Sequence, residues 1–374
     1  MGNPILQFGT SRFLQAHADL FISEALDAGR ALGHVTVVQT TSNPESLARI
    51  EALRARQAYE VRIQGIRHET VIDATAHCRA IDEALNANAD WPVVTERFAR
   101  DARVVISNTG DSGYACLADD TADLLADGAR APRGFAAKLA VLLHARFRAG
   151  AEPLTLLPCE LVSSNGDTLR DIVAGIARAW GCDPAFMRYV EHGCIWVNSL
   201  VDRIVSEPIR PVGAYAEPYA LWAIQRRAGM VLPCEHEAIV VTDDLQRYER
   251  LKLLLLNLGH TWMAERWQVD GRDADENVLH AMRAPVLRAS LESLWRDEVL
   301  PVLDALGQGE QARAYLQDVR ERFENPFLDH RLADISRNHE QKKRRRFKPA
   351  VDMARELGLQ IGQPRLSQAL AQCA

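Results

Sequence analysis

The sequence predicts an α/β protein, with a doubly wound N-terminal domain followed by an all-helical C-terminal domain. Two observations lead to this prediction. Short apolar runs alternate with segments of helical periodicity over the first part of the chain, as they do in parallel βαβ units. Strand signals then stop near Asp243, and helical periodicity dominates from there. We therefore place the two domains at residues 1–242 and 243–374, a division that suits a chain of 374 residues.

The first two βα units are the clearest part of the N-terminal pattern. The apolar run 4–8 is closed by Gly9, and apolar residues at helical spacing follow over 13–32. A β-branched run at 34–39 comes next, and Pro44 suits the first turn of a second helix. Consecutive βα units imply a parallel sheet, because parallel neighbours need a crossover connection.

The remaining elements follow from the same two periodicities. We expect further strands at 59–66, 70–76, 102–109 and 154–160, a helix at 168–180, and one last element of the domain at 195–205. In the second domain, helices are expected at 245–262, 278–294, 300–306 and 312–323. The basic run 342–348 is the strongest charge cluster. Such a run is usually a solvated helix face, but in an acidic chain it also suits an anionic substrate.

Composition excludes several classes of protein. The chain has 44 basic and 50 acidic residues and a formal net charge of -6, which predicts no general affinity for nucleic acid. No stretch reaches the roughly 18 apolar residues of a membrane span, and the N-terminus lacks a signal-peptide pattern. The seven cysteines are scattered without a Cys-x-x-Cys pair. We therefore expect reduced thiols, a cytoplasmic protein and no metal site.

A candidate cofactor site lies at the strand ends of the first domain. The turn Gly9–Phe13 stands between the first strand and the first helix, where a Rossmann-like domain binds a dinucleotide pyrophosphate. Only the first of the usual three glycines is present, so an ordinary βα turn explains this motif equally well. Polar residues also follow several strands, at the edge where doubly wound sheets bind ligands. The candidate cofactor ligands are Gly9, Thr10, Ser11, Phe13, Thr40, Asn108, Thr109 and Asn165.

The end of the second strand bears on the choice between NAD and NADP. It reads Gln39, Thr40, Thr41, so the carboxylate that usually binds the adenosine ribose is absent. The segment from Gln39 to Ser42 also lacks an arginine for a 2′-phosphate. We therefore expect a preference for NADH over NADPH, but only a modest one.

The helical run 249–260 carries the candidate catalytic residues. Its six leucines point all round the helix at roughly 100° per residue, which predicts burial on every side. Glu249, Lys252, Asn257 and His260 fall within an arc of roughly 140° and form one polar stripe. Burying an unpaired ammonium is costly, so Lys252 is either paired or poised to give up its proton, as a general acid/base requires. The alternative is that Lys252 snorkels to water while Asn257 and His260 bond neighbouring backbone groups.

Motifs along most of the chain resemble those of the long-chain polyol-specific dehydrogenase family, which includes mannitol 2-dehydrogenases and uronate reductases. The matching segments are 5–14, 107–109, 198–204, 242–244, the Lys252/Asn257/His260 signature and 322–326. The resemblance implies a metal-independent dehydrogenase and favours NAD as its cofactor. It implies that Lys252 is the general acid/base, that Asn257 binds an oxyanion, that His260 contacts substrate and that Glu249 exchanges protons.

Finer features of the resemblance bear on the substrate. Polyol members have an asparagine where this chain has Leu161, and Asn165 is the nearest residue that could replace it. The segments 158–161 and 325–336 are instead similar to those of tagaturonate reductases. Arginine presents paired donors that match a carboxylate, so the basic run favours a uronate. The candidate substrate ligands are Asp202, Arg203, Lys342 and Arg346.

The predicted activity is the NAD-dependent interconversion of a keto-uronate and its hydroxy acid, of the tagaturonate/altronate type, in a cleft between the two domains. A polyol dehydrogenase with an uncharged substrate and a sugar-phosphate dehydrogenase are alternatives that use the same residues. A nucleotide-binding sensor without activity is a third, which the complete polar stripe argues against. The expected partner is a small molecule, and neither nucleic acid nor a membrane.

Overall fold

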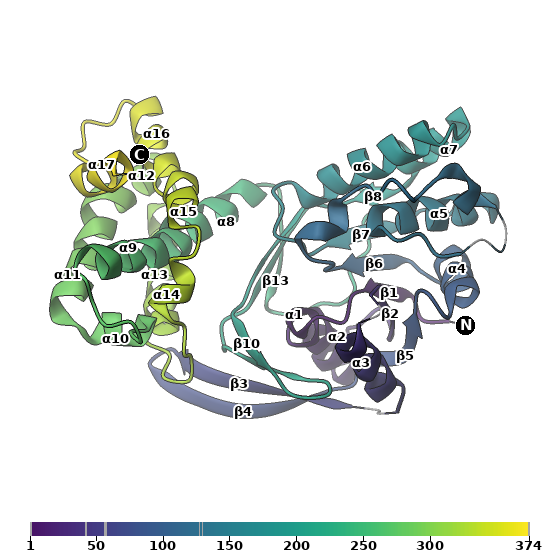
Figure 1. The fold of residues 1–374 in the computed structure, drawn as a ribbon, viewed down its shortest axis with the longest axis horizontal. Coiled ribbons are helices and arrows are strands. Elements are labelled where there is room, and N and C mark those ends of the chain that lie inside the picture. The colour runs from purple at the N-terminus through teal and green to yellow at the C-terminus, as the bar shows by residue number, and fades with distance from the viewer. Residues whose placement is uncertain (1, 42, 56–57, 127, 129, 373–374) are drawn as a thin grey trace. The chain divides into compact units, whose positions relative to one another are not determined.

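The fold of the chain was analysed in a computed structural model, which describes residues 2–41, 43–55, 58–126, 128 and 130–372. The chain forms two compact units. Unit 1 contains the residues up to Ile63 together with Ala74–Ala216 and Ala220–Leu245, and unit 2 contains Gln64–Asp73, Glu217–Tyr219 and the residues from Gln246 onward. Unit 1 holds a parallel sheet flanked by helices, and unit 2 is mainly helical (Figure 1). The predicted fold class is therefore confirmed.

The central sheet of unit 1 has six strands in the order β5-β2-β1-β6-β7-β8. All neighbouring strands in it are parallel. In chain order this is the 3-2-1-4-5-6 arrangement of dinucleotide-binding folds, with the strand order reversing between β1 and β6. The strands are β1 (Ile5–Phe8), β2 (Val35–Gln39), β5 (Ile81–Asn86), β6 (Val104–Ser107), β7 (Thr155–Pro158) and β8 (Ile195–Trp196).

Helices cover both faces of this sheet because successive strand residues point to opposite sides. Ile5 of β1 packs into one core with α2 and α3, whereas Leu6 and Phe8 pack into a second core with α4, α5 and α6. The helices of unit 1 are α1 (Arg12–Gln15), α2 (Ala18–Asp27), α3 (Pro44–Ala55), α4 (Trp91–Arg100), α5 (Phe135–Arg148), α6 (Asn165–Ala179) and α7 (Pro184–Arg188). Short 3₁₀ turns η1 (Asp111–Tyr114) and η2 (Ala122–Leu125) and a π turn η3 (Tyr189–Gly193) join them.

The single helix expected over 13–32 is wrong, because the chain breaks between α1 and α2. His17 has φ -127° and ψ -90°, outside the helical region. The guanidinium of Arg203 donates a hydrogen bond of 2.6 Å to the carbonyl oxygen of Ala16. This contact comes from a residue far along the chain, so local periodicity does not reveal it.

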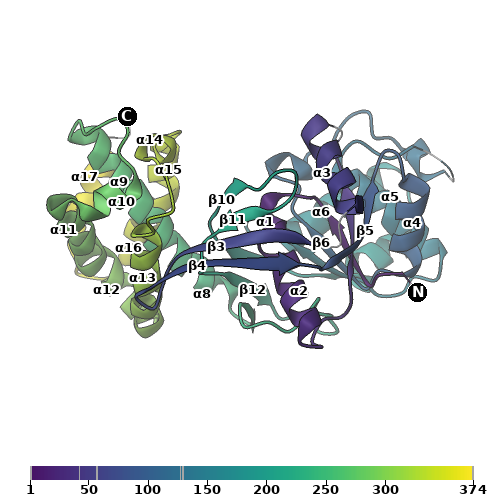
Figure 2. The same ribbon diagram turned by 90° about the horizontal axis from the view of Figure 1, so that it is seen from below.

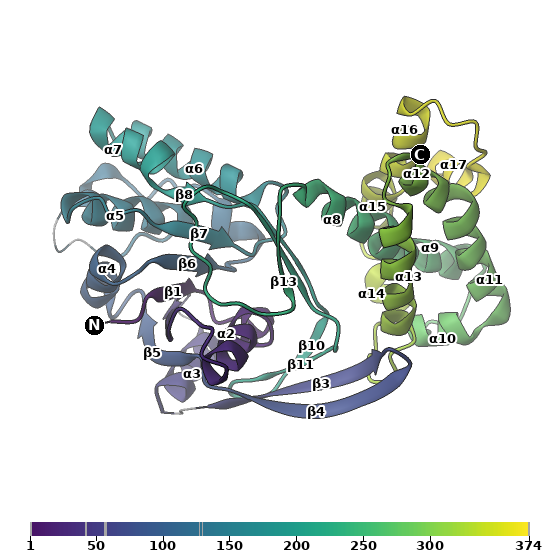
Figure 3. The ribbon, with the colours of Figure 1, turned by 180° about the vertical axis from the view of Figure 1, so that it is seen from behind.

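Two smaller sheets combine the strands expected at 59–66 and 70–76 with strands between residues 199 and 242 that the sequence pattern did not resolve (Figure 3). One has the order β10-β11-β3-β4, and the other has the order β13-β12-β9. Their strands are β3 (Tyr59–Arg67), β4 (Thr70–Cys78), β9 (Ser199–Asp202), β10 (Val205–Pro208), β11 (Ala214–Ala216), β12 (Leu221–Gln225) and β13 (Ile239–Thr242). The single element expected at 195–205 is therefore wrong, since β8, β9 and β10 lie in three different sheets. The side chain of Asn198, between β8 and β9, bonds the backbone N–H of Asp167 and the amide oxygen of Gln225.

Unit 2 is a helical bundle around one apolar core (Figure 2). It contains the end of α8 (Leu245–Leu251), α9 (Leu258–Val269), α10 (Val278–Arg283), α11 (Pro285–Leu294), α12 (Leu300–Ala305), α13 (Gly309–Phe323), α14 (Leu332–Ile335), α15 (His339–Arg346), α16 (Lys348–Glu356) and α17 (Pro364–Ala371). Two π-helical segments interrupt the α-helices, η4 (Lys252–Asn257) and η5 (Trp295–Val299). Across the described ranges, no helix combines the length and the apolar character that crossing a membrane requires.

The segment 322–326 holds unit 2 together. Arg322 forms an ion pair of 2.8 Å with Glu217, and both side chains are almost fully buried. The guanidinium also lies 4.4 Å from the ring centre of Tyr219. Asn325 donates a hydrogen bond of 3.0 Å to the carbonyl oxygen of Gln64. Residues of and just after α13 thus anchor the segments 217–219 and 64–73 within unit 2.

Unit 1 buries a carboxyl group, Asp19 of α2, with no solvent exposure. Its Oδ2 accepts a hydrogen bond of 3.0 Å from the Tyr59 hydroxyl. Burial raises the pKa of Asp19 to about 7, although the hydrogen bonds from Tyr59 and Gln7 oppose this shift. The folded protein therefore favours the protonated form of Asp19 over a wide pH range.

We expect this group to make the protein less stable as pH rises. An unfolded aspartate has a pKa of about 3.9, so its contribution is complete below that pH and is lost as pH rises through the folded value of about 7. The free energy of unfolding should then fall by up to roughly 1.4 kcal/mol per pH unit between these values. Urea denaturation at pH 5 and pH 8 tests this, with Asp19→Asn showing a clearly smaller loss than the unmodified chain. An equal loss in both proteins would contradict the assignment.

Candidate active site

The Gly9 turn lies where the strand order of the central sheet reverses. Gly9 has φ +108°, and a Cβ atom there would come within 2.6 Å of the Asn108 carbonyl oxygen. Only glycine suits such a backbone, which approaches the end of β6 closely. Ser11 caps α1 by accepting a hydrogen bond from the Leu14 N–H, and its hydroxyl donates 3.1 Å to the Asn108 side chain. A glycine turn at the switch point of a parallel sheet is where dinucleotide-binding folds hold the pyrophosphate.

Other candidate cofactor ligands surround this turn in unit 1. Thr10 is buried, and its hydroxyl donates to the side-chain oxygen of Gln39 at the end of β2. Thr40 follows directly and is partly exposed. Phe13 is also partly exposed and stacks on His17 at a ring-centre distance of 4.7 Å. The structure therefore brings the ends of β1, β2 and β6 together at one edge.

The ends of β6 and β7 are joined through a buried carboxylate, Glu160. It accepts hydrogen bonds from the Thr109 N–H at 3.0 Å and the Thr109 hydroxyl at 3.1 Å, and the Ser107 hydroxyl donates at 3.1 Å. Burial raises the pKa of Glu160, although these donors favour its ionised form. Asn108 also reaches this edge, donating 2.9 Å to the carbonyl oxygen of Cys159. Thr109 is therefore held firmly beside Asn108.

Asn165 is committed to the backbone around it. Its amide nitrogen donates to the carbonyl oxygens of Pro158, Glu160 and Ser199, and its oxygen accepts from the N–H groups of Gly166 and Ser199. With 1% exposure, this side chain joins β7, α6 and β9. These contacts support a structural role for Asn165 and leave little capacity for a ligand. Leu161 is 76% exposed, so the apolar side chain at that family asparagine position points to solvent.

The two candidate substrate ligands of unit 1 lie at the end of β9. Asp202 is 2% exposed, and Arg203 is partly buried with its guanidinium bonded to the Ala16 carbonyl. Arg203 thus stabilises the break between α1 and α2 rather than standing open to a ligand.

The four candidate catalytic residues lie on one continuous helical stretch of unit 2, and its centre is π-helical. Lys252 begins the π segment η4 and Asn257 ends it. The Leu258 N–H bonds the carbonyl oxygen of Leu253, five residues back. The regular helix assumed for the polar stripe is therefore wrong here. A turn closed by i→i+5 bonds is wider than an α-helical turn. Residues five apart in it are therefore separated by a smaller angle around the helix axis than the roughly 140° of an α-helix.

Side chains from neighbouring helices donate hydrogen bonds to carbonyl oxygens of this wide turn. The Trp295 indole donates 3.3 Å to the Leu255 oxygen, and Arg346 donates 3.3 Å to the Asn257 oxygen and 2.9 Å to the Thr261 hydroxyl. A Cβ at Gly259 would come within 2.7 Å of Trp295, so glycine permits the close packing. Single-turn π segments of this kind occur often at functional sites.

Burial of the leucines around Lys252 follows the expectation closely. Leu251, Leu254, Leu255, Leu256 and Leu258 are buried, and Leu253 is partly buried. Lys252 and Asn257 are partly exposed. Glu249, one turn earlier, is also partly buried, and this burial raises the pKa of its carboxyl group, although Arg250 opposes the shift. A raised pKa suits a group that takes up and releases protons.

His330 is a candidate site residue that sequence reasoning missed. His260 is 7% exposed, and its ring centre lies 4.8 Å from that of His330 and 4.4 Å from that of Phe323. Burial lowers the pKa of His330, Asp334 raises it, and Lys342 and Arg346 lower it further. The structure therefore brings the polar stripe and two basic residues of α15 close to one histidine. The segment 325–336 was singled out from the sequence, but without a role for this side chain.

The basic run divides into three kinds of side chain. Arg344 and Arg345 are exposed, as in a solvated helix face. Lys343 is buried and pairs with Glu265 at 3.2 Å and with Glu340 at 3.0 Å. Lys342 and Arg346 are partly buried, and neither forms an ion pair with a carboxylate in the described part of the chain. Burial lowers the pKa of both groups.

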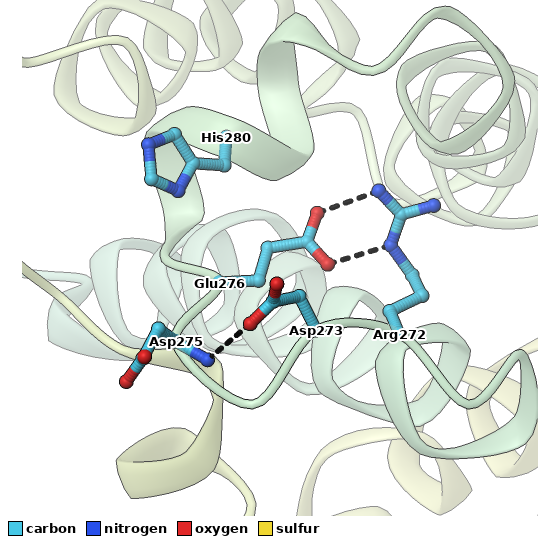
Figure 4. A pocket seen from close by; sticks show the side chains of 5 residues that line it. All are labelled: Arg272, Asp273, Asp275, Glu276 and His280. Atoms are coloured by element: carbon cyan, nitrogen blue, oxygen red, sulfur yellow. Dashed lines mark hydrogen bonds and ion pairs between the residues drawn. The ribbon is translucent and has the colours of Figure 1, made fainter.

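A hollow elsewhere in unit 2 contains none of the candidate residues (Figure 4). Its volume is about 540 Å³, and Arg272, Asp273, Asp275, Glu276 and His280 line it. Arg272 is already paired with Glu276 through two hydrogen bonds of 2.7 and 2.6 Å. Over the described ranges, no group of three or more His, Cys, Asp or Glu side chains is arranged to hold a metal ion. Six cysteines are free thiols, and Cys373 lies outside the described residues.

The fold and these two sets of residues define the class of protein. A 3-2-1-4-5-6 parallel sheet with a glycine turn at its switch point is the architecture of nicotinamide-dependent dehydrogenases. Family models agree: the mannitol dehydrogenase Rossmann domain matches residues 3–231, and the mannitol dehydrogenase C-terminal domain matches residues 244–373. The chain therefore belongs to the mannitol dehydrogenase family, and it is an oxidoreductase that acts on CH–OH groups.

Individual relatives are similar over most of their length. Altronate oxidoreductase of Halalkalibacterium halodurans is 30% identical over 370 residues, covering 93% of this chain and 70% of the relative. Altronate oxidoreductase of Klebsiella pneumoniae is 30% identical over 396 residues, covering 98% and 78%. A solved structure of D-sorbitol dehydrogenase in substrate-free form matches with TM-score 0.87 and 20% identity, covering 100% of this chain and 80% of that one. Pseudomonas fluorescens mannitol 2-dehydrogenase, in a ternary complex with NAD and D-mannitol, matches with TM-score 0.77 and 18% identity over 99% and 79%. These two structures agree with the fold described above.

Proposed function

We propose that this chain is a cytoplasmic, metal-independent reductase that interconverts a keto-uronate and its hydroxy acid, of the tagaturonate/altronate type. NAD is the cofactor. The observation that carries the choice of an acidic substrate is the pair Lys342 and Arg346, two partly buried cations with no carboxylate partner among the described residues. The similarity to altronate oxidoreductases supports the same choice.

Each residue of the helical stretch has a chemical part in this proposal. The bound nicotinamide supplies or accepts the hydride. Lys252 gives a proton to the oxygen of the reduced carbonyl and takes it back in the reverse direction. The Asn257 amide donates a hydrogen bond to that oxygen while it carries negative charge. His260 binds a substrate hydroxyl, and Glu249, with its raised pKa, passes the proton on to water.

The candidate cofactor residues bind at the edge of the unit 1 sheet. The Gly9 turn, with Thr10, Ser11 and Phe13, faces the pyrophosphate, and Asn108 and Thr109 stand beside it across the switch point. Thr40 lies on the adenosine side, next to β2. Asp202 and Arg203 lie at the end of β9, and we assign only their backbone a contact with substrate. The guanidinium of Arg203 is already hydrogen-bonded to the carbonyl oxygen of Ala16.

The side chains of Lys342 and Arg346 bond only neutral acceptors among the described residues. Lys342 donates 2.7 Å to the carbonyl oxygen of Ile335, and Arg346 donates to the Asn257 oxygen and the Thr261 hydroxyl. These neutral acceptors do not compensate the charge that burial makes unfavourable. An anionic group would restore the balance, and guanidinium and ammonium donors bind carboxylates strongly. A neutral ketose would not.

Neutralising Lys342 tests this assignment directly. We expect Lys342→Gln to raise the KM for tagaturonate by about tenfold, as the loss of one charged hydrogen bond implies, while the kinetics with fructose change little. Arg345→Gln is the matched control, because Arg345 lies on the same helix but is exposed, and it should leave both substrates unaffected. The measurement is steady-state kinetics with NADH. Comparable efficiency of the unmodified enzyme on fructose and on tagaturonate would defeat the uronate assignment in favour of a polyol enzyme.

A further inference from the structure

The end of β2 lacks the group that selects NAD in most dinucleotide-binding folds. The residue closing this strand is usually an acid, whose carboxylate binds the ribose 2′-hydroxyl and repels a 2′-phosphate. Here the strand ends with Gln39, followed by Thr40 and Thr41. The side chain of Gln39 is turned inward, where it accepts from Thr10 and donates 2.7 Å to the Thr41 hydroxyl. No carboxylate therefore closes the strand.

An arginine from the next helix reaches this position instead. Arg49 of α3 donates a hydrogen bond of 3.2 Å to the Thr10 hydroxyl, on the turn that faces the pyrophosphate. Its other terminal nitrogen lies 3.3 Å from Glu45, whose side chain is 57% exposed. An exposed pair of this kind contributes little, so a stronger anion can replace Glu45. Arg49 lies outside the segment from Gln39 to Ser42 on which the expected NADH preference depended, and Ser42 itself lies outside the described residues.

A chain of hydrogen bonds through Thr10 and Gln39 links this guanidinium to the Thr41 hydroxyl. The Thr41 hydroxyl is hydrogen-bonded to Gln39 and donates 3.0 Å to the Ser46 hydroxyl. The Ser46 N–H, in the first turn of α3, is held by the Asn43 side chain at 2.9 Å. Thr41 is exposed, so its hydroxyl can turn to a ligand. Guanidinium groups, hydroxyls and helix N-termini are all groups that bind phosphate, and this network contains one of each.

We propose that Arg49, assisted by Thr41, binds the 2′-phosphate of NADP(H), so that the enzyme accepts NADPH in addition to NADH and lacks the modest NADH preference expected from the strand end alone. This rests on the proposed use of a nicotinamide nucleotide in unit 1. Arg49 supplies paired donors and a permanent charge, and the usual repelling carboxylate is missing at the strand end. NAD still binds, because the contacts with its pyrophosphate come from the Gly9 turn and do not involve the 2′ position.

Binding of adenine nucleotides to the unmodified protein is the first test. We expect 2′,5′-ADP to bind at least tenfold more tightly than 5′-AMP in calorimetric titration, because the two probes differ only in the 2′-phosphate. NADPH and NADH fluorescence titrations should show affinities that favour NADPH or are equal. Binding of 5′-AMP as tight as that of 2′,5′-ADP, or tighter, would overturn the proposal while leaving the proposed dehydrogenase intact. Failure of all four nucleotides to bind would overturn both.

Variants of α3 then assign the effect to one side chain. Arg49→Gln should weaken the binding of 2′,5′-ADP by about tenfold or more and change that of 5′-AMP by less than about twofold. Arg49→Lys keeps a charge without the paired donors and should retain part of the preference. Arg54→Gln is the matched control, since Arg54 lies on the same helix but is already paired with Glu51 and Asp90. An equal loss of both probes in Arg49→Gln would show that Arg49 only supports the Gly9 turn, and would refute the proposal.

Discussion

Replacing Lys252 with alanine should lower turnover by a factor on the order of 10² to 10⁴ while leaving NADH binding nearly unchanged. The reason is that Lys252 is the ammonium group of the polar stripe, at the start of a π-helical turn surrounded by leucines. Without a proton donor, the oxygen of the reduced carbonyl must carry its charge into a largely apolar helix environment. Stopped-flow measurement of hydride transfer, with NADH fluorescence as the binding control, separates the chemical step from cofactor binding.

Chemical rescue sharpens this test. Small primary amines added to Lys252→Ala should restore part of the lost rate, since they replace the missing proton donor. Lys348→Ala provides the matched control, because Lys348 is an exposed lysine of the same unit that is bonded to Asp352. Its rate should stay unchanged. Full activity of Lys252→Ala would remove the lysine from the proposed mechanism.

The polar stripe shows how far the sequence could predict the site. Leucine spacing identified a buried helix with Lys252, Asn257 and His260 on it, and the family models match both parts of the chain. The π turn was not predictable, because counting at 3.6 residues per turn assumes regular hydrogen bonds. The donors that bond its carbonyl oxygens, Trp295 and Arg346, come from elsewhere in the chain, and local spacing does not reveal them.

Long-range contacts also explain the other differences in fold and site. The order of the central sheet follows from alternating βα units. The split of 195–205 among three sheets does not, and Asn198, between β8 and β9, bonds residues distant in sequence, Asp167 and Gln225. His330 belongs to no periodic pattern in the sequence. It becomes a candidate site residue only because its ring contacts the ring of His260. Arg49 likewise meets Thr10 across 39 positions, a contact that the strand-end motif does not contain.

Removing one partner of the buried ion pair between Arg322 and Glu217 should destabilise the protein strongly. The closest nitrogen and oxygen of the pair are 2.8 Å apart, the side chains are 2% and 1% exposed, and Arg322 also donates a hydrogen bond of 3.1 Å to the Tyr315 hydroxyl oxygen. Removing one partner leaves the other charge buried and uncompensated. We expect Arg322→Met to lower the free energy of unfolding by about 3–5 kcal/mol, measured from the shift of the urea midpoint.

The double variant distinguishes a buried charge from ordinary loss of packing. Replacing both partners, in Glu217→Leu with Arg322→Met, removes the uncompensated charge along with its partner, and apolar replacements of a buried pair are often neutral. We therefore expect the double variant to recover most of the stability that either single variant loses. Its change in the free energy of unfolding should be much smaller than the sum of the two single changes. If the two losses simply add, the pair contributes through packing against Tyr219 and Tyr315 instead. In that case the anchoring of segment 217–219 on α13 is apolar in origin.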